Sequence, residues 1–159
     1  MHDEPSPHRP FCAQPGMGRP VGARYPDLAD LLPQIVYEID AGGTLTFANR
    51  HAFELLGYTR GDYERGLNVL DLVAPEDRSR CRARIQEALQ GPTSGTPFTV
   101  LKKDGSRLPV LAYSAPILRH GTPIGLRGIL VDISARVEAE AALRESEEKY
   151  RVLFEMESD

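Results

Sequence analysis

Cysteine is scarce in this sequence of 159 residues, which contains only Cys12 and Cys81. Two cysteines cannot build the disulfide framework of a small secreted domain, and they fall short of the ligand set of a structural zinc site. We therefore expect a reducing, cytoplasmic environment and no metal centre.

Long apolar runs are also missing. No segment approaches the ~18 consecutive apolar residues that a membrane-spanning helix requires. Asp3 and Glu4 stand where a secretion signal would be basic and then apolar. We expect no membrane contact from this chain.

The sequence has no concentration of positive charge. The eight acidic and four basic residues from 135 to 159 account for the net charge of −4, because acids and bases balance over residues 1–134. Domains that bind nucleic acid carry a basic patch. Nucleic acid is therefore not an expected partner.

Proline is concentrated at one end of the chain. Six of the 13 prolines lie within the first 26 residues, and this composition predicts a mobile leader over residues 1–25. A short helix is expected next, at residues 27–32, with Leu28, Leu31 and Leu32 on one side.

Alternation of apolar and polar residues then predicts five strands. They span residues 35–40, 45–47, 96–103, 107–118 and 124–133. Short helical segments lie between the second and third strands, beginning at the helix cap Asn49 and ending near Gln90. This order predicts an α+β domain: a five-stranded antiparallel sheet with short helices on one face.

A long helix is expected to follow the last strand, over residues 135–159, with Ser134 as its cap. Leu143, Ser146, Tyr150 and Leu153 lie at the alternating spacings of three and four that are typical of a coiled-coil seam. We expect this helix to pair with a second copy of itself in a homodimer.

Five short motifs occur in order along the predicted domain. They are Phe-Ala-Asn-Arg at 47–50, Leu-Gly-Tyr at 56–58, Pro-Glu-Asp-Arg at 75–78, Lys-Asp-Gly-Ser at 103–106 and Gly-Ile-Leu-Val-Asp-Ile-Ser at 128–134. In this order and spacing they resemble a PAS domain, the small sensory fold of bacterial signalling proteins. The resemblance covers about residues 28–134, and we place the domain at 26–134 and a signalling linker at 135–159.

The resemblance implies a sensory-input domain that binds a small ligand or a partner. Residues 143–155 are similar to the linker that leads from such a domain into a further one. The output module implied first is a histidine kinase, and the alternative is a diguanylate cyclase or phosphodiesterase. An interaction module with a filled core, which only dimerises, remains the competing class.

Motifs of catalysis are absent from the sequence. It contains no phosphate-binding glycine loop, no nucleophile elbow and no His-Glu-x-x-His pair. It also lacks the phospho-acceptor helix and ATP-binding motifs of a histidine kinase and the Gly-Gly-Asp-Glu-Phe run of a cyclase. We expect no catalytic residues and no enzymatic activity in this chain.

The sequence departs from the PAS pattern at two positions. Ala74 stands where the family usually has a histidine before Pro-Glu-Asp, and Ala135 stands where an acid often follows the last strand. The second change removes one polar contact expected at the junction with the linker.

Two cofactors known in the family are disfavoured. Members that bind haem carry a histidine ligand near the position of Cys81, but the helix from 75 to 90 contains no histidine. The flavin photoreceptors carry Asn-Cys-Arg-Phe-Leu-Gln, whereas Cys81 lacks the preceding Asn and is followed by Arg82-Ala83-Arg84. Cys81 shares a helix face with Ile85, which favours simple core packing.

Other polar residues are better explained without a site. His51 and His120 have no second ligand at metal-binding spacing. The arginines at 78, 80, 82 and 84 divide between two sides of their helix, which is typical of a solvated surface.

Seven residues are candidates for a ligand pocket between the sheet and the helices. They are Tyr37, Phe47, Phe53, Ile85, Val100, Val110 and Leu130. Such residues either fill a core or line a cavity for a small organic ligand, and the sequence does not separate these alternatives.

The opposite face of the sheet is also apolar, at Leu111 and Tyr113 among others. A sheet face exposed to water is normally polar, so we expect it to be covered by the helix at 27–32, by a second copy of the chain, or by both. The dimer candidates are therefore Leu111, Tyr113, Leu143, Tyr150 and Leu153.

Signal relay is expected where the last strand meets the long helix. Asp132, Ile133 and Ser134 occupy this junction. Movement of the sheet would pass through them into the helix and on to the output module.

Overall fold

The centre of the protein is an antiparallel sheet of five strands. The strands are β1 (Ile35–Asp40), β2 (Leu45–Ala48), β3 (Thr96–Leu101), β4 (Arg107–Arg119) and β5 (Thr122–Asp132). They lie in the order β2-β1-β5-β4-β3. The computed structural model describes residues 25–158; the predicted leader, apart from Tyr25, lies outside them.

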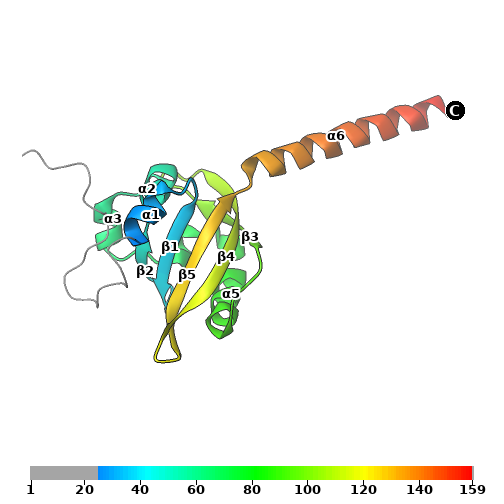
Figure 1. Ribbon diagram of the computed structural model, residues 1–159. Coiled ribbons are helices and arrows are strands. Elements are labelled where there is room, and N and C mark those ends of the chain that lie inside the picture. The colour runs from blue at the N-terminus through cyan, green and yellow to red at the C-terminus, as the bar shows by residue number, and fades with distance from the viewer. Residues whose placement is uncertain (1–24, 159) are drawn as a thin grey trace, which may run out of the picture.

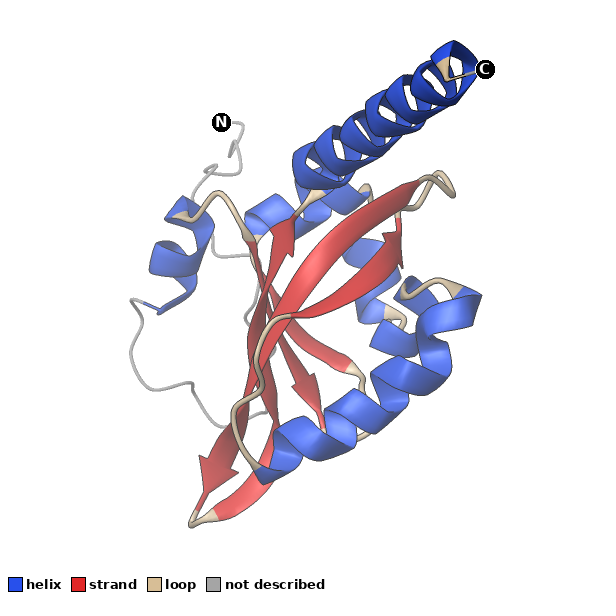
Figure 2. Ribbon diagram, turned by 90° about the vertical axis from the view of Figure 1, so that its right-hand side faces the viewer, coloured by secondary structure: helices blue, strands red, loops and turns tan. Residues whose placement is uncertain are grey.

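Helices lie on both faces of the sheet. They are α1 (Tyr25–Leu31), α2 (Arg50–Leu56), α3 (Arg60–Glu64), α4 (Val69–Leu72), the 3-10 turn η1 (Pro75–Asp77), α5 (Arg78–Gln90) and α6 (Ser134–Glu157). Helices α2, α4 and α5 pack on the inner face, whereas α1 lies alone on the outer face (Figure 2). The predicted α+β arrangement is present.

The hydrophobic core lies between the inner face of the sheet and these helices. Val110 of β4 is 0% exposed and Leu126 of β5 is 1% exposed. Ile85 and Ala88 bring the apolar side of α5 against them, at the helical spacing that the sequence shows.

Helix α6 leaves the body and projects away from it (Figure 1). None of its residues is buried. Over residues 25–158, no helix has both the length and the hydrophobicity needed to cross a membrane.

The second strand differs from the predicted alternation. Phe47 pairs with Glu38 but Leu45 pairs with Ile39, so Thr46 is an extra residue that forms a bulge. A bulge reverses the face on which the following side chains lie. Leu45 therefore packs with the inner core and Phe47 packs on the outer face, which makes the predicted pocket position of Phe47 wrong.

Asn49 joins three elements through its side chain, which is 1% exposed. Its Oδ1 accepts hydrogen bonds from the N–H groups of Val36, at 3.0 Å, and Ala52, at 3.2 Å. Its Nδ2 donates to the carbonyls of Ala29 and Gln34, both at 2.8 Å. This amide thus caps α2, binds β1 and ties α1 to the outer face.

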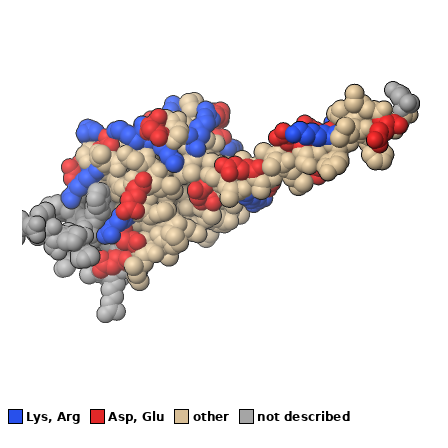
Figure 3. Space-filling view, turned by 90° about the horizontal axis from the view of Figure 1, so that it is seen from above, with Lys and Arg blue, Asp and Glu red and all other residues tan. Residues whose placement is uncertain are grey.

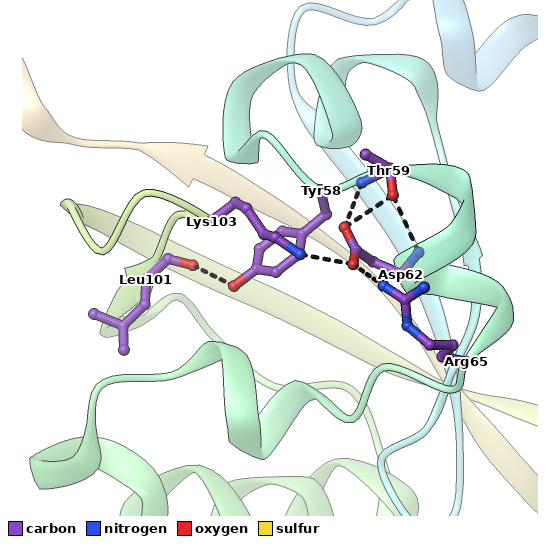
Figure 4. Close-up of polar contacts among 6 residues, drawn as sticks. All are labelled: Tyr58, Thr59, Asp62, Arg65, Leu101 and Lys103. Carbon is purple, nitrogen blue, oxygen red and sulfur yellow. Dashed lines mark hydrogen bonds and ion pairs between the residues drawn. The ribbon is translucent and has the colours of Figure 1, made fainter.

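A second polar cluster fastens α3 to the turn between β3 and β4 (Figure 4). The Asp62 carboxylate accepts hydrogen bonds from the Thr59 N–H at 2.8 Å and from the Lys103 Nζ at 2.7 Å, and it also pairs with Arg65. The Lys103 hydrogen bond, followed by that from Thr59, holds the pKa of the Asp62 carboxyl well below its usual range. Because every donor here already has its acceptor, we assign the cluster to structure.

We predict that Asn49→Ala lowers the free energy of unfolding by about 2–4 kcal/mol, because it removes four hydrogen bonds from a buried position, among them the side-chain partner of the Val36 N–H. Urea denaturation of both proteins measures the difference. Asn68→Ala is the matched control: Asn68 caps α4 but is less buried, so its loss costs about 1 kcal/mol. Equal effects of the two variants would contradict the central position given to Asn49.

Candidate ligand cavity

A cavity of about 100 Å³ lies between the inner face of the sheet and helices α2, α4 and α5. Its walls are almost entirely apolar, with Val110, Leu126 and Leu130 on the sheet side and Ile85 and Ala88 on α5. A space of this size exceeds what one water needs, and apolar cavities of similar size take up small organic molecules.

Five of the seven predicted pocket residues line this cavity: Tyr37, Ile85, Val100, Val110 and Leu130. Phe47 and Phe53 do not. Phe47 lies across the sheet, for the reason given above. Phe53 packs against the core from α2. Its ring also makes an edge contact with Tyr63 of α3, with ring centroids 6.1 Å apart, so it links two helices and does not line the cavity.

Polar groups gather at one end of the cavity. The Tyr37 hydroxyl and the Ser114 hydroxyl are hydrogen-bonded at 2.8 Å. Burial raises the pKa of the Tyr37 phenol, so it stays protonated. A Cβ on Gly128 would lie 2.6 Å from the Tyr37 hydroxyl, so only glycine leaves this position open.

Cys81 also lines the cavity and is buried. Burial, with a smaller effect of the Asp77 charge, raises the pKa of the Cys81 thiol to about 11. A thiol needs a lowered pKa to act as a nucleophile at neutral pH. The environment of Cys81 is the opposite of an activating one.

Three polar lining residues escaped the sequence analysis: Ser114, Thr93 and Arg84. The alternation that placed Val110 inside extends to Ser114, four residues on, so this signal was present. Arg84 precedes Ile85 on α5, and its long side chain can reach the cavity from the edge of the helix. Thr93 lies in the loop after α5, where no periodicity applies.

The outer face of the sheet is covered only in part. Ala29 of α1 packs on Val36, Phe47 and Ile129. Tyr113 remains 41% exposed. The first of the expected covers is thus present over β1, β2 and β5. Leu28 and Leu31 of α1, and Leu32 directly after it, are exposed.

The junction residues connect the sheet to α6. Asp132 accepts hydrogen bonds from the Ser134 N–H, at 2.8 Å, and from the Ser134 hydroxyl, at 2.6 Å. These bonds lower the pKa of the Asp132 carboxyl. Ser134, expected as the cap, is instead the first residue of α6. The cap position is Ile133, which makes no side-chain capping bond, and Asp132 holds Ser134 from the residue before it. The Ile133 N–H donates to the Pro109 carbonyl at 3.0 Å.

Neither histidine singled out in the sequence belongs to a cluster. His120 lies in the turn between β4 and β5 with a φ of 50°, and His51 is in the first turn of α2. In the part of the chain that the structure describes, no three His, Cys, Asp or Glu side chains come together as a metal site would require.

Comparison with known families identifies the fold. The sequence model of the PAS fold matches residues 29–138, well over half of the chain. The chain belongs to the PAS family. No curated protein matches the sequence.

Solved structures agree with this assignment. The PAS domain is similar to a domain from Colwellia psychrerythraea, at 23% identity and a TM-score of 0.62 over 69% of this chain and 93% of that one. A sensory box histidine kinase/response regulator from Burkholderia thailandensis matches at 19% identity and a TM-score of 0.61, over 80% of this chain and 98% of that one. The N-terminal domain of a diguanylate cyclase from Marinobacter aquaeolei matches at 18% identity and a TM-score of 0.54, over 65% of this chain and 97% of that one.

We predict that iodoacetamide alkylates Cys81 of the folded PAS domain more slowly than a free thiol, in a Cys12→Ser background that removes the other cysteine. Since the raised pKa leaves little thiolate, the rate should increase about tenfold per pH unit from pH 7 to 10. Mass spectrometry follows the adduct, and the urea-unfolded protein is the control. A rate that levels off near pH 8 would contradict the buried thiol.

Proposed function

We propose that this PAS domain is a cytoplasmic sensory-input module that binds a small organic ligand in the cavity. Occupancy would be relayed through α6 to an output module in the same polypeptide, with a histidine kinase as the first candidate. The observation that carries the proposal is the unfilled cavity, because natural cores are packed with few voids larger than a water molecule.

The cavity wall leads directly into α6. Leu130 lines the cavity and is followed two residues later by Asp132, whose side chain accepts from the N–H of the first residue of α6. On the neighbouring strand, Val110 lines the cavity and pairs with Asp132 across the sheet. A small displacement of β4 or β5 by a ligand therefore reaches the first turn of α6 without crossing another element.

Helix α6 carries an apolar stripe that has no cover within the described chain. Leu143 is 60% exposed and Leu153 is 59% exposed. Its ion pairs, such as Arg136–Glu140 at 2.9 Å, are exposed and contribute only about 0.3–0.5 kcal/mol each. We therefore propose a homodimer in which two α6 helices pair along Leu143, Tyr150 and Leu153. Leu111 and Tyr113, on the outer face of the sheet, would form a second contact between the two copies.

Surface charge is compatible with this arrangement. Basic and acidic side chains lie next to one another on the body and along α6 in the view of Figure 3. The structural neighbours named above support the choice of output, since one is named a histidine kinase/response regulator and another a diguanylate cyclase. A cyclase is accordingly the second candidate.

Filling the cavity tests ligand binding. Ala88 lines the cavity and is 1% exposed, whereas Ala83 of the same helix is exposed. Native mass spectrometry should find an added mass per chain in the wild type and in Ala83→Leu, and none in Ala88→Leu. Bare polypeptide in all three, with no xenon-induced shift of cavity methyl signals in NMR, would contradict a ligand-binding sensor.

Removing the Asp132 carboxylate at the start of α6 tests the proposed relay. In Asp132→Ala the first turn of α6 loses both hydrogen bonds from Ser134, whereas the core is untouched. We expect a folded domain, within about 1 kcal/mol of the wild type, that no longer changes the activity of a histidine kinase module fused in register to α6. Ser134→Ala keeps the backbone hydrogen bond and should retain most of the response. An unchanged response in Asp132→Ala would remove the junction from the relay.

A further inference from the structure

We infer that the cavity takes a small carboxylate with a branched or short hydrocarbon group, and that Arg84 holds the carboxylate. This inference rests on the proposed function, because it names the ligand class for the same cavity.

Arg84 has two satisfied nitrogens and one unsatisfied nitrogen. Its Nη1 pairs with Glu87 at 2.6 Å, and its Nη2 donates to the Ser94 carbonyl at 3.3 Å. Its Nε is buried and has no hydrogen-bond partner. Within residues 25–158 it is the only buried side-chain nitrogen or oxygen without one, and Arg84 is part of the cavity lining.

An unpaired buried N–H is costly, and native proteins satisfy almost all such groups. Guanidinium nitrogens can only donate, so the missing partner is an acceptor. A carboxylate oxygen is the strongest acceptor for this donor, because the hydrogen bond is then assisted by charge on both sides.

The charge of Arg84 is available for such a ligand. Its ionic partner Glu87 lies on the solvent side, with a side chain that is 61% exposed, so water screens that pair. Arg84 itself is 29% exposed. A carboxylate at this end of the cavity would therefore sit near solvent, which lowers the cost of desolvating it.

Hydroxyl groups at the same end can serve the second carboxylate oxygen. Tyr37 and Ser114 now share one hydrogen bond in which either can be the donor. One of the two hydroxyls therefore keeps a proton to donate elsewhere. The Thr93 hydroxyl is already engaged, because it donates to the Ser114 carbonyl at 3.4 Å.

The remaining walls set the size and character of the rest of the ligand. They are apolar, and the volume is about 100 Å³. For comparison, an engineered apolar cavity of about 150 Å³ binds benzene. A branched group of about four carbons fits this space, so isovalerate is a suitable probe and 3-methylbutan-1-ol is its neutral counterpart.

Calorimetric titration of the intact chain with both probes tests the inference. We expect isovalerate to bind at least tenfold more tightly than the alcohol, and Arg84→Met to remove this preference. Glu87→Gln is the matched control: it removes only the exposed ion pair and should leave isovalerate affinity within about threefold. Shifts of the Ile85 and Val110 methyl signals in NMR would place the probe in the cavity.

The outcomes separate this inference from the proposed function. Equal binding of the two probes, unaffected by Arg84→Met, would overturn the role of Arg84 and leave a ligand cavity standing. Isovalerate binding without methyl shifts would also overturn it. If neither probe nor xenon enters the cavity, the inference and the proposed function both fail. The wild-type comparison of isovalerate with the alcohol decides the matter even if Arg84→Met does not fold.

Discussion

The arrangement of this PAS domain depends on the complete hydrogen bonding of one buried amide. Asn49 uses both lone pairs of its oxygen and both protons of its nitrogen, on four backbone groups. Those groups belong to α1, the residue before β1, β1 itself and α2. An aspartate would accept from the two N–H groups but would face the two carbonyls with a charged oxygen. The geometry of this corner therefore selects an amide and positions the helix layer under which the cavity lies.

The cavity lowers the stability of the folded domain, and in return it leaves room for a ligand. Voids in engineered cores cost about 24 cal/mol per Å³, so about 100 Å³ corresponds to roughly 2 kcal/mol. A better-packed core was available by simple means, since Ala88 and Ala112 line the space with the smallest apolar side chains. A ligand that enters regains the lost contacts and stabilises the folded state by mass action. The polar end, with Arg84 Nε unsatisfied, adds a preference for what enters.

Much of this structure was predictable because it follows local rules. The pairing partners β3 and β4, the strand alternation around Val110 and the apolar face of α5 all appear where the sequence predicts them. Phe47 was misplaced because a bulge at Thr46 depends on how two strands pair, and no single-strand pattern contains that information. Arg84 was misjudged for a related reason. Its spacing on α5 is that of a surface residue, and its contact with Ser94 of the following loop arises only in the folded structure.

The free-energy cost of the cavity sets the size of the signal that the proposed relay could carry. A ligand shifts the equilibrium between two states only by its difference in affinity for them. If one state of the sheet closes the cavity and the other keeps it open, the void cost of roughly 2 kcal/mol is the scale of that difference. This corresponds to a population shift between tenfold and a hundredfold. Since Leu130 and Val110 line the void and flank Asp132, the shift would act on the residue whose side chain binds the start of α6. None of the α6 residues is buried, so the pairing with a second helix proposed above would be free to respond.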